Sequence, residues 1–139
     1  MYVDHLERIQ AAATRDGLDE VKRAREEFHE LTGPFEDGEP WFELRMTMFL
    51  DWYLLDRRGG DDLTPAERFL DETWNDLKPQ ERAEFESLTV TLRSVFRVED
   101  QRGDQLTLTD LAGGGRWVAR CTIPTVGLAR ENIFDSRLA

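Results

Sequence analysis

The chain has 139 residues, of which 40% are hydrophobic and 34% charged, and it contains four tryptophans and eight phenylalanines. This composition supports one hydrophobic core of domain size and argues against disorder, because disordered chains are poor in large apolar residues. The formal net charge of −11 disfavours binding to nucleic acid or to anionic membranes, since both attract Lys and Arg.

The negative charge is concentrated in the N-terminal two-thirds of the chain. Residues 1–94 carry 23 acidic residues against 12 Lys or Arg, whereas residues 95–139 carry 6 of each kind. The acidic part repels a phosphate backbone, but it permits a basic protein partner. Solubility alone explains such a charge equally well, so the charge by itself identifies no partner.

Cys121 is the only cysteine, which excludes an internal disulfide and a cysteine-rich zinc site. The N-terminus has no apolar run preceded by positive charge, so we expect no secretory signal. The most apolar segment, residues 41–55, is interrupted by Glu43, Arg45 and Asp51 and is too short to cross a membrane as a helix. These features predict a soluble, cytoplasmic protein.

Helical spacing of apolar residues predicts two helices in the first third of the chain. Residues 2–15 and 18–31 place apolar side chains at helical intervals along one side. Asp16-Gly17 separates the two segments and Gly33-Pro34 ends the second, because glycine and proline interrupt a helical pattern.

Residues 41–55 predict a third helix that is apolar on nearly every side. Such a helix must be covered over most of its surface, so we expect it to form the centre of the core. Pro40 suits a first helical position, and Arg57-Arg58 places positive charge at the end where the helix dipole favours it.

The segment TPAE at residues 64–67 is the clearest helix start in the chain. Thr64 is expected to cap this helix, and Glu67 to bond back to the amide of the capping residue. The helix is expected to run to about residue 77, and a fifth helix to occupy residues 79–94. The side chains expected on the buried faces of these two helices are Phe69, Leu70, Trp74, Phe85, Leu88 and Leu92.

After residue 94 the apolar pattern changes from helical spacing to alternation, which is typical of strands. Gly113-Gly114-Gly115 is expected to form a hairpin turn. It lacks the Lys and Ser or Thr that follow the glycines of a phosphate-binding loop. The expected strands occupy residues 95–99, 106–111, 117–122 and 131–138.

These elements predict an α+β fold, in which about five helices surround the central apolar helix and a small C-terminal antiparallel β-sheet follows. The acidic helical region is assigned to residues 1–94 and the small β subdomain to residues 95–139. We expect the two regions to form one compact unit.

Several short segments of the chain resemble, in their order, a group of uncharacterised bacterial proteins. These proteins have a helical segment of the type FLDWF…TPxERFL and a small β subdomain, and some of them lie beside a SEC-C zinc motif. The resemblance implies the same architecture but no activity, and the SEC-C cysteines are absent here. The segments that carry it are FLDWY (49–53), LTPAERFL (63–70), LKPQER (77–82), VFRV (95–98) and LTDL (108–111).

Glu26 and His29 have the Glu-x-x-His spacing that places both side chains on one helix face, as in di-iron bundles. Such a site needs a second pair of this kind and two further glutamates. The other histidine, His5, has no Glu three residues before it. The favoured interpretation is therefore a solvated helix face, and no metal or other cofactor is expected.

Asp51 and Asp56 flank the end of the apolar helix and give an alternative function, a small enzyme or ligand-binding protein that uses these carboxylates. Charges in such a helix more often pair with a neighbouring charge or mark its one hydrated stripe. No serine or cysteine lies in a nucleophile-elbow pattern. We therefore assign no catalytic residue.

A second alternative is a β module that binds single-stranded nucleic acid. Phe96 and Trp117, together with Arg97, Arg116 and Arg120, provide the aromatic and basic groups that such modules use. The β region has no net charge and the rest of the chain is acidic, so packing in the core and in a hairpin is the favoured role of the two aromatic residues.

The favoured function is a non-catalytic protein-interaction or adaptor module. The last predicted strand alternates between two faces, and a terminal strand tends to lie at a sheet edge, where another chain can pair with it. A second copy or another protein is the expected partner; alternatively, the strand only closes its own sheet. The residues assigned to partner binding are Ile133, Phe134, Arg137 and Leu138.

Overall fold

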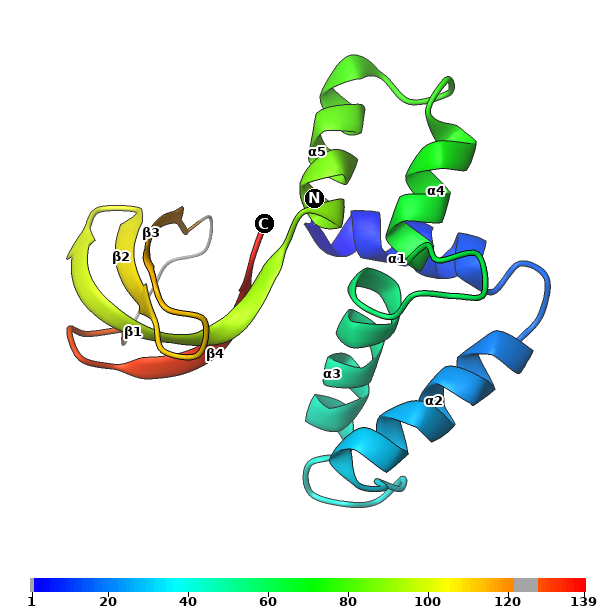
Figure 1. Ribbon diagram of the computed structural model, residues 1–139, viewed down its shortest axis with the longest axis horizontal. Coiled ribbons are helices and arrows are strands. Elements are labelled where there is room, and N and C mark those ends of the chain that lie inside the picture. Colours follow the sequence, from blue (N-terminus) through cyan, green and yellow to red (C-terminus); the bar gives the residue numbers. More distant parts are fainter. Residues whose placement is uncertain (1, 122–127) are drawn as a thin grey trace. The chain divides into compact units, whose positions relative to one another are not determined.

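The computed structural model describes residues 2–121 and 128–139 (Figure 1). In these ranges five helices precede a four-stranded antiparallel sheet, which confirms the predicted α+β fold. The chain divides into two compact units, a helical unit (Met1–Thr89) and a sheet unit (Val90–Ala139). Each unit has a hydrophobic cluster of its own.

The five helices lie close to their predicted positions, with two corrections at their ends. The last helix ends at Thr89 instead of residue 94, because Leu92 and Ser94 pair with Leu138 and Ser136 in the sheet. The fourth helix ends at Thr73. The helices are α1 (Tyr2–Ala13), α2 (Asp19–Thr32), α3 (Phe42–Leu55), α4 (Pro65–Thr73) and α5 (Pro79–Thr89).

Helix α3 supplies the middle of the helical core. The ring of Phe49 is 2% exposed and lies 5.6 Å from Phe28 of α2 and 5.9 Å from Tyr53, measured between ring centroids. The prediction that this helix is covered on most sides is wrong for its beginning, where Trp41 and Leu44 are 69% and 53% exposed. Its last two turns carry the buried side chains Phe49, Tyr53, Leu54 and Leu55.

Helix α4 begins with the predicted capping box. The amide of Glu67 donates to the Thr64 hydroxyl at 3.1 Å, and the amide of Thr64 donates to the Glu67 carboxylate at 2.8 Å. Pro65 occupies the first helical turn, where a missing N–H costs nothing. At the other end Trp74 is 39% exposed, so the prediction that it is buried is wrong; α4 stops before bringing it into the core.

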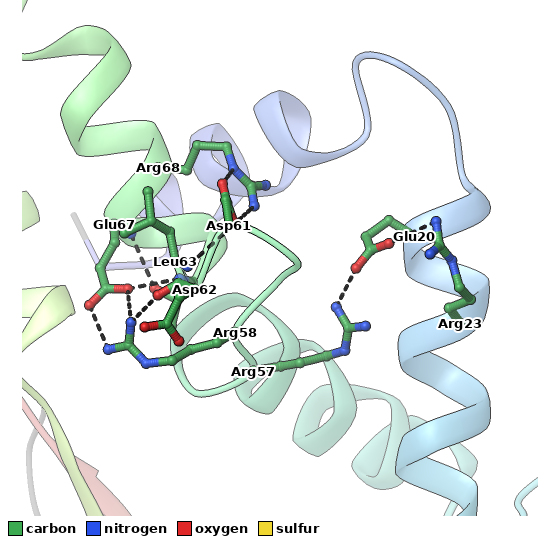
Figure 2. Close-up of polar contacts among 10 residues, drawn as sticks. Glu20, Arg23, Arg57, Arg58, Asp61, Asp62, Leu63, Glu67 and Arg68 are labelled. Atoms are coloured by element: carbon green, nitrogen blue, oxygen red, sulfur yellow. Dashed lines mark hydrogen bonds and ion pairs between the residues drawn. The ribbon is translucent and has the colours of Figure 1, made fainter.

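Three arginines hold the connection between α3 and α4 (Figure 2). Arg57 donates to Glu20 and Glu27 of α2, both at 2.6 Å. Arg58 bonds to Glu67, the residue that also completes the capping box. These contacts tie the end of α3 both to α2 and to the start of α4.

The third arginine, Arg68, donates to Asp61 inside the same connection at 2.8 Å. This pair, together with the Leu63 amide, lowers the pKa of the Asp61 carboxyl group to about 2. The hydrogen bonds that Arg57 donates to Glu27 and Glu20 hold the pKa of its guanidinium above its ordinary range. The charged groups of this region therefore have structural partners within the helical unit.

The sheet unit consists of four antiparallel strands in the order β3-β2-β1-β4. Strand β1 bends along its length (Figure 1), and its register with β2 shifts between Val98 and Asp100, as at a β-bulge. The apolar face is centred on Phe96, Val98, Leu106 and Leu108. The strands are β1 (Leu92–Arg102), β2 (Gln105–Asp110), β3 (Arg116–Arg120) and β4 (Ile133–Leu138).

The glycine run between β2 and β3 forms the predicted hairpin turn. Asp110, which is 4% exposed, accepts from the amides of Ala112 and Gly113 at 3.0 and 2.9 Å and from the Ser94 hydroxyl. These bonds, that from Ser94 foremost, lower the pKa of the Asp110 carboxyl group. Gly114 follows with φ of 74°, a conformation that favours glycine.

A candidate protein-interaction groove on the sheet

A groove of about 470 Å³ lies on the apolar face of the sheet unit. Leu106 and Leu108 of β2 are 2% and 1% exposed and lie in the core beneath it. Their positions follow from strand alternation, which sends every second side chain of β2 to the apolar face. The side chains that line the groove from the neighbouring strands include Leu92, Trp117, Ala119, Cys121, Phe134 and Leu138.

Both ends of the sheet contribute to this one groove. Strands β3 and β4 occupy opposite ends of the strand order, yet side chains of both line the same hollow. The sheet must therefore curl, so that its two edge strands face a shared space. This arrangement combines an apolar surface with two strand edges.

The hydrogen-bond pattern shows which backbone groups of β4 face away from the sheet. The amide of Val98 donates to the carbonyl of Asn132 at 2.9 Å, and Phe96 lies opposite Phe134. Bonding alternates along an antiparallel strand. The backbone N–H groups of Ile133 and Asp135 consequently point away from β1.

The same reasoning applies to β3 at the other end of the sheet. The amide of Cys121 donates to the carbonyl of Asp104 at 2.7 Å, and the amide of Asp110 to the carbonyl of Gly115 at 3.0 Å. Between these two bonds, inter-strand hydrogen bonding alternates from residue to residue along β3. The backbone N–H and C=O groups of Val118 therefore point away from β2. Its side chain is 69% exposed.

The four residues assigned to partner binding lie on both faces of β4. Phe134 and Leu138 pack against the core of the sheet unit, and the Phe134 ring lies 6.2 Å from Phe96. Ile133 is 61% exposed, while Arg137 donates to the Thr91 hydroxyl at 2.7 Å. Strand β4 joins the chain's own sheet through β1 and also lies at its edge, so both sequence interpretations describe part of its position.

The charged side chains that line the groove are both arginines, within the part of the chain that the structure describes. Arg120 is 72% exposed at its side chain and lies 3.4 Å from Asp104. Arg137 of the opposite edge strand belongs to the lining, and its guanidinium donates to the hydroxyl of Thr91, another lining residue, at 2.7 Å. Asp135 lies two residues before Arg137, on the same face of β4, where it pairs with Arg93 at 2.9 Å. It is absent from the lining, so the described residues bring no acidic side chain to the groove.

Sequence reasoning found the edge strand but missed the groove. Alternation within the predicted strand at residues 117–122 does not show that β3 curls towards β4. Trp117 is 44% exposed in the outer strand of its hairpin, whereas Phe96 is fully buried as expected. The curl depends on pairing across the whole sheet, and no short sequence signal reports it.

The residues of the other candidate sites do not come together in the structure. Asp56 is exposed at the end of α3 and Asp51 is half-buried on the helix, and the lining of the groove includes neither. Glu26 is exposed, and the His29 ring packs 4.8 Å from Phe35 with its Nε2 atom buried and without a hydrogen-bond partner. Among the described residues no three His, Cys, Asp or Glu side chains gather as metal ligands would.

No protein-family model matches the chain, and no curated protein or solved structure shows significant similarity to it. Across residues 2–121 and 128–139, none of the helices has the length and apolar character needed to span a membrane.

Proposed function

We propose that this chain is a non-catalytic protein-interaction module, in which the outer edge of β4 accepts an extended segment of a partner protein. The observation that carries the proposal is the position of β4 at the end of the strand order. Its outward backbone groups offer the hydrogen bonds that a further strand would complete. The exposed Ile133 side chain offers an apolar contact beside them.

The charge of the chain supports a protein partner over a polyanion. Of the 29 acidic residues, most lie in the helical unit, and they repel phosphate groups over long distances. A cytoplasmic location belongs to the same proposal, since a single cysteine suits a reducing compartment in which disulfides rarely form.

A proline substitution at the edge tests the proposal directly. Asp135→Pro removes an N–H that points away from β1, and proline is tolerated at such edge positions. The intact chain and this variant would be screened against a displayed library of linear peptides. We expect the intact chain to select peptides that Asp135→Pro no longer binds.

Asp135→Asn is the matched control, because it removes the same charge and the pair with Arg93 but keeps the backbone N–H. It should bind the selected peptides as the intact chain does. Equal binding by the proline variant, with its circular dichroism unchanged, would show that the β4 edge is not the binding surface. Failure to select any peptide would count against the module itself.

A further inference from the structure

We infer that the occupant of the groove is an extended partner segment in which apolar residues alternate with acidic ones, seated between β3 and β4. This inference rests on the proposed function and adds the chemistry of the partner. Three observations carry it: the apolar lining, the two edges that share one hollow, and the arginines at its sides.

The outward backbone groups of the edge strands β3 and β4 indicate that the occupant of the groove is an extended strand. Outward N–H and C=O groups of Val118 on one side and of Ile133 and Asp135 on the other are arranged for ladder hydrogen bonds. A helix already uses its backbone N–H and C=O groups in internal hydrogen bonds. A small apolar molecule has no hydrogen-bonding groups that could pair with the two edges. An extended peptide supplies both donors and acceptors along its length.

The apolar lining of the groove determines the chemistry of every second side chain of the partner strand. Side chains of a strand point alternately to opposite faces, so one set faces Leu106, Leu108 and Phe134 inside the groove. These neighbours are apolar and largely buried. Burying further apolar surface there contributes roughly 25 cal/mol per Å², which selects leucine, valine or similar residues at the inward positions.

The two arginines of the lining determine which charge is favoured on the remaining side chains of the partner segment. Arg120 and Arg137 are the charged side chains among the described residues of the lining, and they belong to opposite edge strands. A carboxylate on the segment meets a guanidinium at either side, whereas a lysine there would meet like charge. Acidic residues therefore alternate with the apolar ones in the segment that this groove selects.

Synthetic peptides provide the test. The probe is an acetylated nine-residue peptide that alternates leucine and glutamate; its counterparts carry lysine in place of glutamate, or the first composition in scrambled order. We expect the intact chain to bind the glutamate peptide at least about tenfold more tightly than the lysine peptide. Binding should shift the NMR amide signals of both β3 and β4.

Two variants assign the binding to the groove. Ala119→Phe fills the hollow and should abolish binding, while Val95→Phe introduces the same aromatic ring on β1 at a side chain outside the lining. Arg120→Glu leaves one positive and one negative side chain beside the groove, so it should abolish the preference for the glutamate peptide. Arg102→Glu is its control, because Arg102 is 86% exposed at its side chain and lies outside the lining.

The outcomes separate this inference from the proposed function. Charge-independent binding that Asp135→Pro still abolishes would overturn the inference and leave the interaction module standing. Absence of any peptide binding, in the library and in the synthetic set, would overturn both. A dimer in light scattering that Ala119→Phe dissociates would show that a second copy, and not an acidic partner segment, fills the groove.

Discussion

At the scale of single residues, several carboxylates of this chain act as hydrogen-bond acceptors within the structure. Asp110 illustrates this, because it satisfies two turn amides and the Ser94 hydroxyl at once. Sequence reasoning treated it as an ordinary strand residue. Its partners come from the turn that follows and from a neighbouring strand, so only the assembled sheet reveals its role.

Thr64 is a residue whose local role the sequence did reveal. Thr64→Ala removes the oxygen that accepts the Glu67 amide, and it should lower the free energy of unfolding by about 1 kcal/mol. Urea denaturation followed by circular dichroism measures the change. Thr47→Ala, in the exposed middle of α3, removes a threonine without a capping role and should leave stability nearly unchanged. Equal effects of the two substitutions would show that capping is not the cause.

At the scale of elements, α3 organises the helical unit. Phe49→Ala removes a ring that is 2% exposed, and it should cost about 3–5 kcal/mol of unfolding free energy because the cavity cannot collapse fully. Chemical denaturation tests this value. Leu44→Ala, at a position that is 53% exposed, should cost less than about 1 kcal/mol. A small loss at both sites would place the core elsewhere.

The elements were predictable where local chemistry determines them and less so at their junctions. The capping box marks the start of α4 without help from the rest of the fold. The junction of α5 and β1 was misplaced because Leu92 continues the helical spacing of Phe85 and Leu88 and equally begins the alternation that includes Phe96. Leu92 belongs to the strand because it pairs with Leu138, a partner that lies far along the chain and that local spacing does not reveal.

At the scale of the whole molecule, the response to acid depends on two opposing effects. The helical unit carries 23 acidic and 11 basic residues, so acidification relieves repulsion. Against this, five of its carboxyl groups besides Asp4 have lowered pKa values because they accept hydrogen bonds from side chains or backbone amides; in Glu67 these bonds outweigh burial. These groups are Glu27, Asp61, Glu67, Glu81 and Glu84.

We expect the second effect to dominate and the helical unit to lose stability in acid. A group with a lowered pKa binds fewer protons when folded, so its contribution is full above the ordinary glutamate value of 4.5. The contribution is lost as the pH falls towards 2, near the pKa of Asp61. Thermal unfolding followed by far-UV circular dichroism measures this dependence. A midpoint that rises steadily between pH 6 and pH 3 would show that relief of repulsion is the larger effect.

The candidate site was predictable in part for a related reason. The alternation in residues 131–138 indicated an edge strand, and β4 is one. The groove depends on the curl of four strands, which brings residues of β3 and β4 from opposite ends of the strand order to one hollow. This curl is a long-range property of the chain. Sequence periodicity describes faces of elements, and the space between two edges is not a property of either element alone.

The open edges described above also carry a hazard, since an unpaired strand beside an apolar face is a template for ordered aggregates. Fibril growth stacks identical strands in register. In β4 such stacking would place Asp135 beside Asp135 and Arg137 beside Arg137, and like charges in adjacent strands repel. The charges that alternate with apolar residues along this edge therefore act as gatekeepers, which let a complementary strand pair while they oppose stacking of the chain on copies of itself.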